Sequence, residues 1–403
     1  MNRSRILIIA QDLRISGTSE GIVSRSFIAK IRDISPDSLI EVVYTPTHIS
    51  EDYLSLLPID SLCVYNISIK PNFPVKWINR ITRNIFGFYF YEWSLTQKFR
   101  KVFKKINSDH YDHIFVRSSG LKYELIRALK GTKLLNKSII NIHDPFPLFW
   151  YPDSGKTLTH SDIFEFKEMR EVLLNTAEII CPSKKLSKDL RLLYALNKKI
   201  YTIPHQFSKT VFPKSTDLEK AFNKKKRLTI CYHGSIQFGR DLRILLDAYM
   251  CLIENSRELK KLTEMVFRLK SNEVFALQSE YNSENIRVLE GIEFSTALYE
   301  QEEIADINIL LDNGQVYSNV LVGKAPVLAS TGKAVFVVTP LDSELRDVIL
   351  DHSFVANSVD KEDIQHKLLH LIYSILESKH DPDIFQDYFS LKEFSNAINT
   401  VIS

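Results

Sequence analysis

A glycine turn followed by an arginine is the first feature of this sequence that could do chemistry. The segment HGSIQFGR places Gly234 and Ser235 directly after the apolar run 227–233, and Arg240 just before residues with helical spacing. A strand, a tight turn and a helix start direct backbone N–H groups and the positive end of a helix dipole at one point. Arg240 could add two hydrogen bonds to a phosphate there. The segment therefore predicts a phosphate site, with an ordinary loop and a solvated arginine as the alternative.

A second cation, Lys324, lies eight residues before Gly332, which precedes the apolar run Ala334–Val338. Proline is favoured in the first turn of a helix, so Pro326 predicts a helix that starts near Lys324. Such a helix would present the lysine and free N–H groups at the end of a strand. We therefore predict a second phosphate contact, and the alternative is a solvated lysine on a helix that only covers the sheet.

Two more loops carry useful residues. In IINIHDPFPLFWYP a buried strand delivers His143 and Asp144, a candidate catalytic pair that can donate, accept and orient hydroxyl protons. A structural histidine in a capped loop is the alternative. In AQDLRISGTSEG, Gly17 and Gly21 precede or open the first long helix, where glycines let the backbone approach a bound acceptor group. A plain surface loop fits that pattern equally well.

These loops belong to an alternating series of strands and helices. We predict helices at Glu20–Arg32 and Leu121–Leu129, among others, and two sets of strands. The first set is Arg5–Ala10, Leu39–Tyr44, His113–Arg117, Ser138–His143 and Ala177–Cys181. The second set begins at Leu228 and includes Met265–Leu269, Ile286–Glu290, Ile307–Leu311 and Ala334–Val338. This order predicts parallel sheets with helices on both faces.

The chain of 403 residues is too long for one ordinary core. We expect an N-terminal acceptor-binding domain at 1–205, a linker at 206–226, a C-terminal nucleotide-sugar domain at 227–385, and a helix at 386–403 that could pack back on the first domain. The predicted fold class is α/β, with two Rossmann-like doubly wound domains facing a central cleft. Open parallel sheets bind ligands at the carboxyl ends of their strands, so we expect the active site in that cleft.

The composition is that of a soluble globular protein, with 44% hydrophobic and 25% charged residues. No apolar run approaches the length of a membrane-spanning helix, and the apolar run of the N-terminus is too short for a secretion signal. The four cysteines have neither metal-binding nor redox spacing. We therefore expect a cytoplasmic protein in a reducing compartment.

Residues 70 to 105 combine cationic and aromatic side chains. Nine are Lys or Arg, one (Glu92) is acidic, and ten are aromatic. Basic side chains attract anionic headgroups, and Trp and Tyr favour the membrane interface, so we expect peripheral binding to the cytoplasmic face of an anionic membrane. Nucleic acid is not expected, because the fold context disfavours it. The alternative is that the aromatic residues fill the core and the basic residues are solvated.

Three segments resemble the GT-B glycosyltransferases of the family 4-like type (glycosyl transferases group 1). They are YHGSIQFGRDLRILLDAY, EEIADINILLD and GKAPVLASTGKAVFVVTP. The resemblance covers most of the chain and implies retaining transfer of a sugar from a nucleotide sugar. It implies that Arg240 and Lys324 hold the donor diphosphate and that His143 lies near the transferred sugar. With the basic aromatic segment, it favours a glycan or polyprenyl-linked acceptor in bacterial envelope polysaccharide synthesis.

The sequence departs from the family where the donor sugar and nucleotide are bound. Val327 stands where a glutamate usually binds the ribose hydroxyls, and Asn319 stands where a second glutamate contacts the sugar in many members. Ala334 replaces the usual proline after Gly-Lys. Asp312 or Asn313 could take over a hydroxyl contact. The identity of the nucleotide and the sugar does not follow from these positions.

We expect no metal and no cofactor. The one Asp-x-Asp pattern, Asp381-Pro-Asp383, lies in a polar loop near the C-terminus and is treated as chance. Arg240, Lys324 and helix N-termini can neutralise a departing diphosphate in place of a metal ion. A metal-independent glycosyltransferase is thus the main hypothesis. A sugar-nucleotide epimerase of the same fold and a catalytically inactive binding protein are the alternatives.

Overall fold

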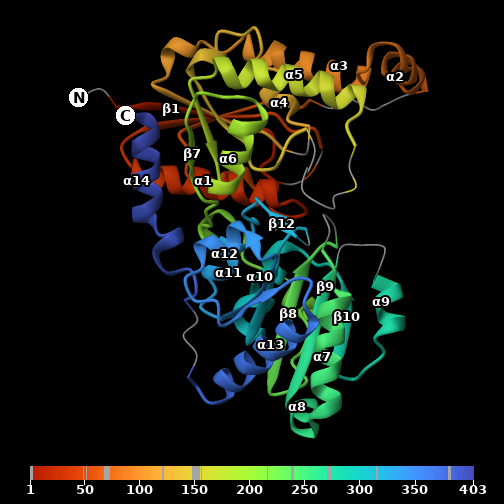
Figure 1. The fold of residues 1–403 in the computed structure, drawn as a ribbon. Helices are drawn as coiled ribbons and strands as arrows, with labels where there is room; N and C mark the ends of the chain where they lie inside the picture. Colours follow the sequence, from red (N-terminus) through yellow and green to blue (C-terminus); the bar gives the residue numbers. More distant parts are fainter. Residues whose placement is uncertain are drawn as a thin grey trace. The chain divides into compact units, whose positions relative to one another are not determined.

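The computed structural model describes residues 3–48, 50, 52–67, 73–119, 122–147, 155, 157–215, 217–236, 240–269, 274–314, 316–379 and 383–403. These residues form two compact units (Figure 1). Unit 1 contains the described residues of 1–150, 155–212 and 390–403, and unit 2 contains those of 213–389. Parts of three sequence predictions, at Lys70, Leu121 and Asp381, lie outside the described residues.

Unit 1 is built on a seven-stranded parallel sheet with the order β3-β2-β1-β4-β5-β6-β7. Its strands are β1 (Arg5–Ala10), β2 (Leu39–Tyr44), β3 (Ser61–Val64), β4 (His113–Arg117), β5 (Ser138–Asn141), β6 (Glu178–Cys181) and β7 (Ile200–Thr202). The chain order reverses between β1 and β4. Ligands of doubly wound sheets bind outside the carboxyl ends of the strands at such a point.

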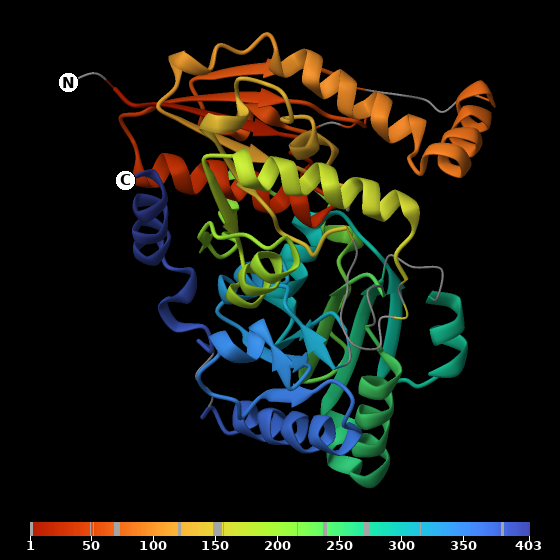
Figure 2. The same ribbon diagram turned by 45° about the horizontal axis from the view of Figure 1, so that its top comes forward.

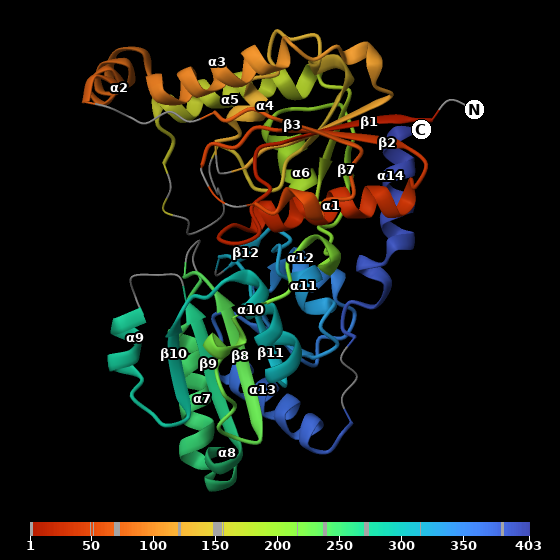
Figure 3. The same ribbon diagram turned by 180° about the vertical axis from the view of Figure 1, so that it is seen from behind.

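Helices cover both faces of this sheet (Figures 1 and 3). On one face, Leu7 and Ile9 of β1 share a core with α3 (Phe90–Phe103), α4 (Glu124–Arg127), α5 (His160–Asn175) and α6 (Lys184–Leu193). On the other face, Phe27 of α1 (Ser19–Ile34) makes edge contacts with Phe115 of β4 and with Phe394 of α14 (Leu391–Ile402). The C-terminal helix α14 is therefore part of unit 1.

One helix of unit 1 stands apart from its core. The helix α2 (Phe73–Phe86) packs against α3, and Figure 2 shows it beyond one end of that helix. None of the α2 residues whose burial is described is buried. No helix in the described part of the chain is long and apolar enough to cross a membrane.

Unit 2 contains a six-stranded parallel sheet with the order β10-β9-β8-β11-β13-β15. Its strands are β8 (Leu228–Gly234), β9 (Thr263–Leu269), β10 (Ile286–Glu290), β11 (Ile307–Leu311), β13 (Ala334–Thr339) and β15 (Val355–Asn357). One face packs against α7 (Arg243–Asn255), α9 (Val274–Glu280) and α13 (Lys361–Leu376), and the other against α11 (Ala325–Ala329) and α12 (Glu344–Val348). The chain order reverses between β8 and β11.

Shorter elements complete unit 2. They are α8 (Arg257–Leu262), α10 (Phe294–Tyr299) and the two-stranded sheet of β12 (Tyr317–Ser318) and β14 (Asp342–Ser343).

The predicted fold class, α/β with two Rossmann-like doubly wound domains, is confirmed. Two predicted elements were too long. The strand expected at Ser138–His143 ends at Asn141, and the described part of the helix expected at Leu121–Leu129 is the four-residue α4. Tyr123 has a left-handed backbone conformation immediately before α4, with φ of 49°, which prevents an earlier helix start.

Candidate functional site

The four predicted phosphate-binding residues of unit 2 lie together at the carboxyl end of β8. Gly234 ends that strand, and a Cβ at this position would clash with Nζ of Lys324, so the lysine lies against the bare glycine. Arg240 donates from Nη1 to the carbonyl oxygen of Ser235 at 3.2 Å. Lys324 directly precedes α11, with Pro326 in its first turn, as predicted. We call Gly234, Ser235, Arg240 and Lys324 the unit 2 cradle.

Each of the two cationic side chains of the cradle has a buried nitrogen that lacks a hydrogen-bond partner within the described chain. Residue Lys324 is partly exposed, but its Nζ atom is buried and has no hydrogen-bond partner there; it lies 4.7 Å from the centroid of the Tyr232 ring. The Nε atom of Arg240 is buried and likewise without a partner. Burial, and secondarily the charge of Arg240, holds the pKa of Lys324 well below its usual value. An anion bound at this point would offset the free-energy cost of burying these two nitrogen atoms without hydrogen-bond partners.

The acidic residue beside the cradle, Asp312, is already engaged. Its carboxylate accepts hydrogen bonds from the backbone N–H of Asn313 at 2.6 Å, from Ser318 Oγ at 2.8 Å and from Thr339 Oγ1 at 2.7 Å. Burial nevertheless raises the pKa of Asp312 to about 6. These contacts fix the loop that follows β11 and join it to the end of β13.

The other predicted donor contacts of unit 2 differ in what they offer. Asn313 is buried, and its Oδ1 has no hydrogen-bond partner among the described residues. Asn319 is also buried. Val327 is buried within α11, where it packs as an apolar residue. Asn313 therefore has a buried polar atom that a ligand could bind.

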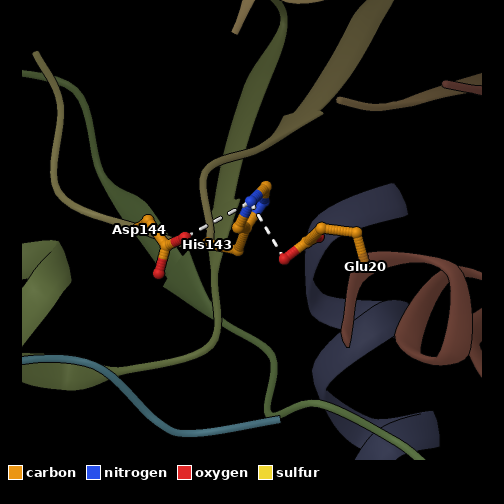
Figure 4. Close-up of side chains that lie close together, drawn as sticks. All are labelled: Glu20, His143 and Asp144. Atoms are coloured by element: carbon orange, nitrogen blue, oxygen red, sulfur yellow. Dashed lines mark ion pairs between the residues drawn. The ribbon is translucent and has the colours of Figure 1, made fainter. Parts of the chain in front are cut away.

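In unit 1, the predicted pair His143 and Asp144 is joined by a third residue, Glu20 (Figure 4). Glu20 lies in the first turn of α1, and its Oε1 is 3.1 Å from His143 Nε2. The Oδ2 atom of Asp144 is 3.7 Å from the same nitrogen. The histidine side chain is 2% exposed, whereas the two carboxylates are only partly buried. We call these three residues the unit 1 cluster.

Tyr123 holds the backbone of the unit 1 cluster in place. Its hydroxyl oxygen accepts hydrogen bonds from the backbone N–H groups of His143 at 3.0 Å and Asp144 at 2.7 Å, and it donates to the carbonyl oxygen of Asp144 at 3.1 Å. Its ring packs on the imidazole, with centroids 5.1 Å apart. One fully buried tyrosine thus fixes both the loop and the histidine ring.

The charges around the cluster favour neutral forms of two of its members. Burial, followed by the charge of Asp144, raises the pKa of Glu20 well above its usual value, while Arg117 acts in the opposite sense. Burial, followed by His205 and Arg117, holds the pKa of His143 well below its usual value. Both shifts favour the uncharged forms, a protonated carboxyl at Glu20 and a neutral imidazole at His143.

The two predicted glycines of unit 1 have different local roles. Gly21 is buried in the first turn of α1, where a Cβ would clash with the backbone carbonyl of Arg14. Gly17 has φ of 92°, and a Cβ added there would meet no atom within 4 Å. The loop between β1 and α1 is tied by Asp12, which accepts hydrogen bonds from Arg14 and Thr18. Acceptor binding at this loop stays a prediction.

Within the described residues, the unit 1 cluster also has the spacing of a metal site. One ligand atom from each of Glu20, His143 and Asp144 lies within 4.8 Å of the others. The residue types, two carboxylates and an imidazole, suit several divalent cations. The buried guanidinium of Arg117 already supplies positive charge here. That charge opposes the rise in the pKa of Glu20, although burial and Asp144 outweigh it. The expectation of a metal-free mechanism stays a prediction.

Sequence reasoning missed Glu20, Tyr123 and Tyr232. Glu20 follows Gly17 within the quoted AQDLRISGTSEG segment, and an acid in the first turn of a helix is a weak signal that the pattern did contain. Tyr123 and Tyr232 gave no signal, because a buried tyrosine cannot be told from a core residue until its contacts are known.

No protein-family model and no curated protein sequence matches this chain. Solved structures do match it along nearly its whole length. Sucrose-phosphate synthase from Thermosynechococcus elongatus has a TM-score of 0.63 at 13% identity, with 100% of this chain and 95% of that chain covered. HepE of Anabaena, in complex with UDP and glucose, has a TM-score of 0.61 at 11% identity, with 99% of each chain covered.

An epimerase is among the matching structures as well. UDP-GlcNAc 2-epimerase from Neisseria meningitidis, bound to UDP-GlcNAc, has a TM-score of 0.57 at 13% identity, with 99% of each chain covered. Identities this low establish the fold and leave the activity open. The chain has the GT-B fold, which these glycosyltransferases and epimerases share.

Proposed function

We propose that the protein is a glycosyltransferase that moves a sugar from a nucleotide-sugar donor to a glycan or polyprenyl-linked acceptor. The observation that carries this proposal is the buried, unpartnered Nζ of Lys324 beside Arg240 at the carboxyl end of β8. A diphosphate would give Nζ of Lys324 and Nε of Arg240 the hydrogen-bond partners that the described chain does not provide. The switch point between β8 and β11 is also where a doubly wound sheet binds its ligand.

In this mechanism the cradle acts on the leaving group. As the bond between the sugar and the diphosphate breaks, negative charge grows on the phosphate oxygens. Lys324 and Arg240 stabilise that charge from fixed positions, which is the kind of contribution that lowers a barrier most. The resemblance to retaining enzymes favours attack on the same face, with the leaving phosphate helping to remove the proton of the acceptor hydroxyl.

The unit 1 cluster is the proposed site for hydroxyl chemistry. His143 is neutral, held in one orientation by Tyr123, and next to two carboxyl groups. A neutral imidazole can donate to one oxygen or accept from another. We assign to His143 and Asp144 the orientation of sugar or acceptor hydroxyls.

A sugar-nucleotide epimerase is the second candidate, and two observations favour it. An epimerase bound to UDP-GlcNAc shares this fold, and the unit 1 cluster contains the acid and base groups that proton removal beside a sugar carbon requires. The two candidates differ in their need for an acceptor, since an epimerase converts the donor alone.

Product analysis separates the candidates. The protein is incubated with UDP-, GDP-, dTDP- and CMP-sugars, with and without a short-chain polyprenyl phosphate or diphosphate sugar. Acceptor-dependent release of nucleotide together with an extended glycan supports the transferase. An altered nucleotide sugar without an acceptor identifies the epimerase, and saturable binding without any product identifies a binding protein.

We also propose that α2 and α3 bind an anionic membrane surface that carries the acceptor. On α2, Trp77, Ile85 and Phe86 are 62%, 69% and 64% exposed. The cations Lys76, Arg80 and Arg83 lie on the same helix, and none of them is buried. The sequence of α2 contains no acidic residue. Exposed aromatic and basic side chains on one amphipathic helix are typical of helices that lie in a membrane interface.

Liposome sedimentation tests the membrane proposal. Changing Lys76, Arg80 and Arg83 to Glu is expected to abolish binding to phosphatidylglycerol vesicles at low salt, because each basic residue contributes about 1 kcal/mol near an anionic surface. Changing the exposed Lys260 and Lys261 of α8 to Glu is the matched control and should leave binding intact. Wild-type protein that stays in the supernatant at low salt would contradict the proposal.

A further inference from the structure

We propose that Tyr232 is a positioning residue that holds both cations of the unit 2 cradle in place for a diphosphate without neutralising either of them. Its effect on donor binding rests on the proposed function, whereas the arrangement of the side chains is a property of the ligand-free protein. The two parts can therefore fail separately.

Tyr232 lies two residues before the end of β8, and its side chain belongs to the core of unit 2. The residue is 0% exposed, and the centroid of its ring lies 6.0 Å from that of Phe267 on β9. The hydroxyl group is the part of the side chain that reaches the loop after β8. Close packing of this kind keeps the ring face and the hydroxyl in one orientation.

The hydroxyl of Tyr232 determines where Arg240 is held. It donates to the carbonyl oxygen of Ser235 at 3.3 Å, and Nη1 of Arg240 donates to the same oxygen at 3.2 Å. Tyr232 therefore fixes the group to which the guanidinium is attached. The Nε atom of Arg240 is buried and has no hydrogen-bond partner among the described residues, so it can still donate to a ligand.

The ring of Tyr232 holds the second cation. Nζ of Lys324 lies 4.7 Å from the ring centroid, which is within the range of the attraction between an ammonium group and an aromatic face. A Cβ on Gly234 would clash both with this Nζ and with the Tyr232 hydroxyl, so the two groups occupy the space beside the bare glycine. The two cations are thus held by different parts of one side chain.

A tyrosine differs from a carboxylate in how it holds a cation. A carboxylate would cancel the charge of Lys324 and compete with an incoming phosphate, whereas a ring face attracts the ammonium group and carries no net charge. The nearest acid described at this site, Asp312, is engaged by hydrogen bonds within its own loop and with β13. Both cations therefore keep charge that a diphosphate can use.

The end of β8 is held independently from the other face of the sheet. Nε2 of His233 and Oε2 of Glu300 are hydrogen-bonded at 2.7 Å. The same carboxylate accepts hydrogen bonds from the side chain of Arg268 and from the backbone N–H of Phe222. Loss of the Tyr232 hydroxyl should therefore leave the strand in place, which makes Tyr232→Phe a usable variant.

Calorimetric titration with UDP tests the effect on binding. Tyr232→Phe keeps the ring under Lys324 but leaves the Ser235 carbonyl without one of its two donors. Arg240 is then less firmly positioned, and UDP should bind roughly threefold to tenfold more weakly, as expected for the loss of one hydrogen bond. Tyr232→Leu also removes the ring and should weaken binding further.

Double-mutant cycles show which cation each part of the tyrosine serves. Tyr232→Phe should have almost no further effect in the Arg240→Ala background, but it should keep nearly its full effect in the Lys324→Met background. The additional loss from Tyr232→Phe to Tyr232→Leu should disappear in the Lys324→Met background. A tyrosine that only filled the core would weaken UDP binding equally in each background.

Tyr249→Phe is the matched control. Tyr249 of α7 belongs to the same core, and its hydroxyl is hydrogen-bonded to Thr263 Oγ1 at 2.9 Å. Thr263 begins β9, whereas the cradle lies where strands end. This variant should lower the melting temperature about as much as Tyr232→Phe does and leave the affinity for UDP unchanged.

The exchange of the Arg240 Nε–H with solvent tests the positioning part without a ligand. Its nitrogen-15 signal is identified by its loss in Arg240→Ala. The exchange should be faster in Tyr232→Phe than in the wild-type protein and unaltered in Tyr249→Phe. Equal exchange rates in Tyr232→Phe and the wild-type protein would overturn the positioning role.

Three binding results would also overturn it. They are wild-type affinity for UDP in Tyr232→Phe, an equal loss of affinity in Tyr249→Phe, and an undiminished loss in the Arg240→Ala background. If UDP binding behaves as expected but no sugar is transferred, the role of Tyr232 stands and the transferase fails. If transfer occurs and Tyr232→Phe binds UDP normally, the role fails and the transferase stands. If the wild-type protein binds none of UDP, GDP and dTDP, both fail.

Discussion

The unit 1 cluster and the unit 2 cradle occupy corresponding places in two similar sheets, yet their side chains are of different types. Each lies at the carboxyl ends of strands beside the point where strand order reverses. In unit 1 a histidine lies beside two carboxyl groups. In unit 2 a lysine and an arginine lie side by side, and the nearby Asp312 is already bonded to its own loop.

Burial has opposite effects on protonation in the two sites. Burial in unit 1 keeps a proton on a carboxyl group, whereas burial in unit 2 favours the loss of a proton from a lysine. A site of the first kind suits proton movement at hydroxyl groups. A site of the second kind has cationic side chains without a counter-charge, so a bound anion stabilises it.

The largest effect is expected from Lys324→Met, which should change binding and stability in opposite directions. Loss of one charge-assisted hydrogen bond of about 1.5 to 3 kcal/mol should weaken UDP and donor binding roughly tenfold to hundredfold. Removal of a buried cation without a partner should at the same time leave the melting temperature unchanged or raise it. Calorimetric titration and thermal unfolding measure the two quantities.

Two further variants sharpen that experiment. Arg240→Ala should weaken binding to a similar extent, because it removes the second cation of the cradle. Lys333→Met, a lysine just after α11 and outside the cradle, should change neither quantity. Unaltered donor binding in both Lys324→Met and Arg240→Ala would remove the phosphate assignment.

The next effect concerns protons at the cradle. Because burial and Arg240 lower the pKa of Lys324 in the empty cradle, a bound diphosphate should raise that pKa and draw a proton from solvent. Affinity for UDP should therefore decrease as the pH rises through the pKa of the empty state. Titrations in buffers with different ionisation enthalpies count the protons, and Lys324→Met should take up none. Proton release by the wild-type protein would contradict this expectation.

A smaller effect, on stability, is expected from Glu92→Gln in α3. This variant tests whether burial in unit 1 keeps a proton on a carboxyl group other than that of Glu20. Burial, then a hydrogen bond with Glu165, raises the pKa of Glu92 to about 8. The folded chain therefore keeps a proton that the unfolded chain releases above about pH 4.3, so this contribution to stability is lost as the pH rises towards 8. Glu92→Gln should raise the melting temperature at pH 9 more than at pH 5.

The matched control for Glu92 is Glu171→Gln on α5. Glu171 is 51% exposed and paired with Lys130 at the surface, so its replacement should change stability by less than about 1 kcal/mol at any pH. Equal pH profiles for wild-type protein and Glu92→Gln would show that Glu92 does not carry the expected proton.

The smallest expected effect is that of a chelator. If the cations of the cradle neutralise the leaving group, EDTA should leave the initial rate of transfer unchanged. Activity that is lost with EDTA and restored by Mn²⁺ would point to the unit 1 cluster as the ion site. The unit 1 cluster would then be a metal site rather than a site for proton movement.

The sequence predicted central strands better than edge strands. The bounds of the central strands β1, β2, β4 and β11 match the predicted ones, because most of their residues are buried and form continuous apolar runs in the sequence. Of the edge strands, β10 was predicted with its observed bounds, whereas β3, β7 and β15 were missed. All four residues of β3 are exposed, so nothing in their pattern marks a buried surface.

The two sites also differed in how well the sequence predicted them. The cradle residues follow a glycine turn and a helix start, which are local features, and the structure brings all four together. Glu20 lies far from His143 in sequence, and the pair meets only because α1 begins beside the end of β5. A contact of that kind depends on the order of strands in the sheet, which one sequence does not reveal in advance.

The packing of α14 on unit 1 has a consequence for synthesis of the chain. Phe394 contacts Phe27, but the residues of unit 2 lie between them in sequence. At ordinary translation rates the ribosome needs about 10 to 35 s to add residues 213–389. During that interval the apolar face of α1 has no α14 to cover it, so the nascent chain exposes a surface that chaperones bind. Unit 1 therefore gains its α14 contact only after unit 2 has been made.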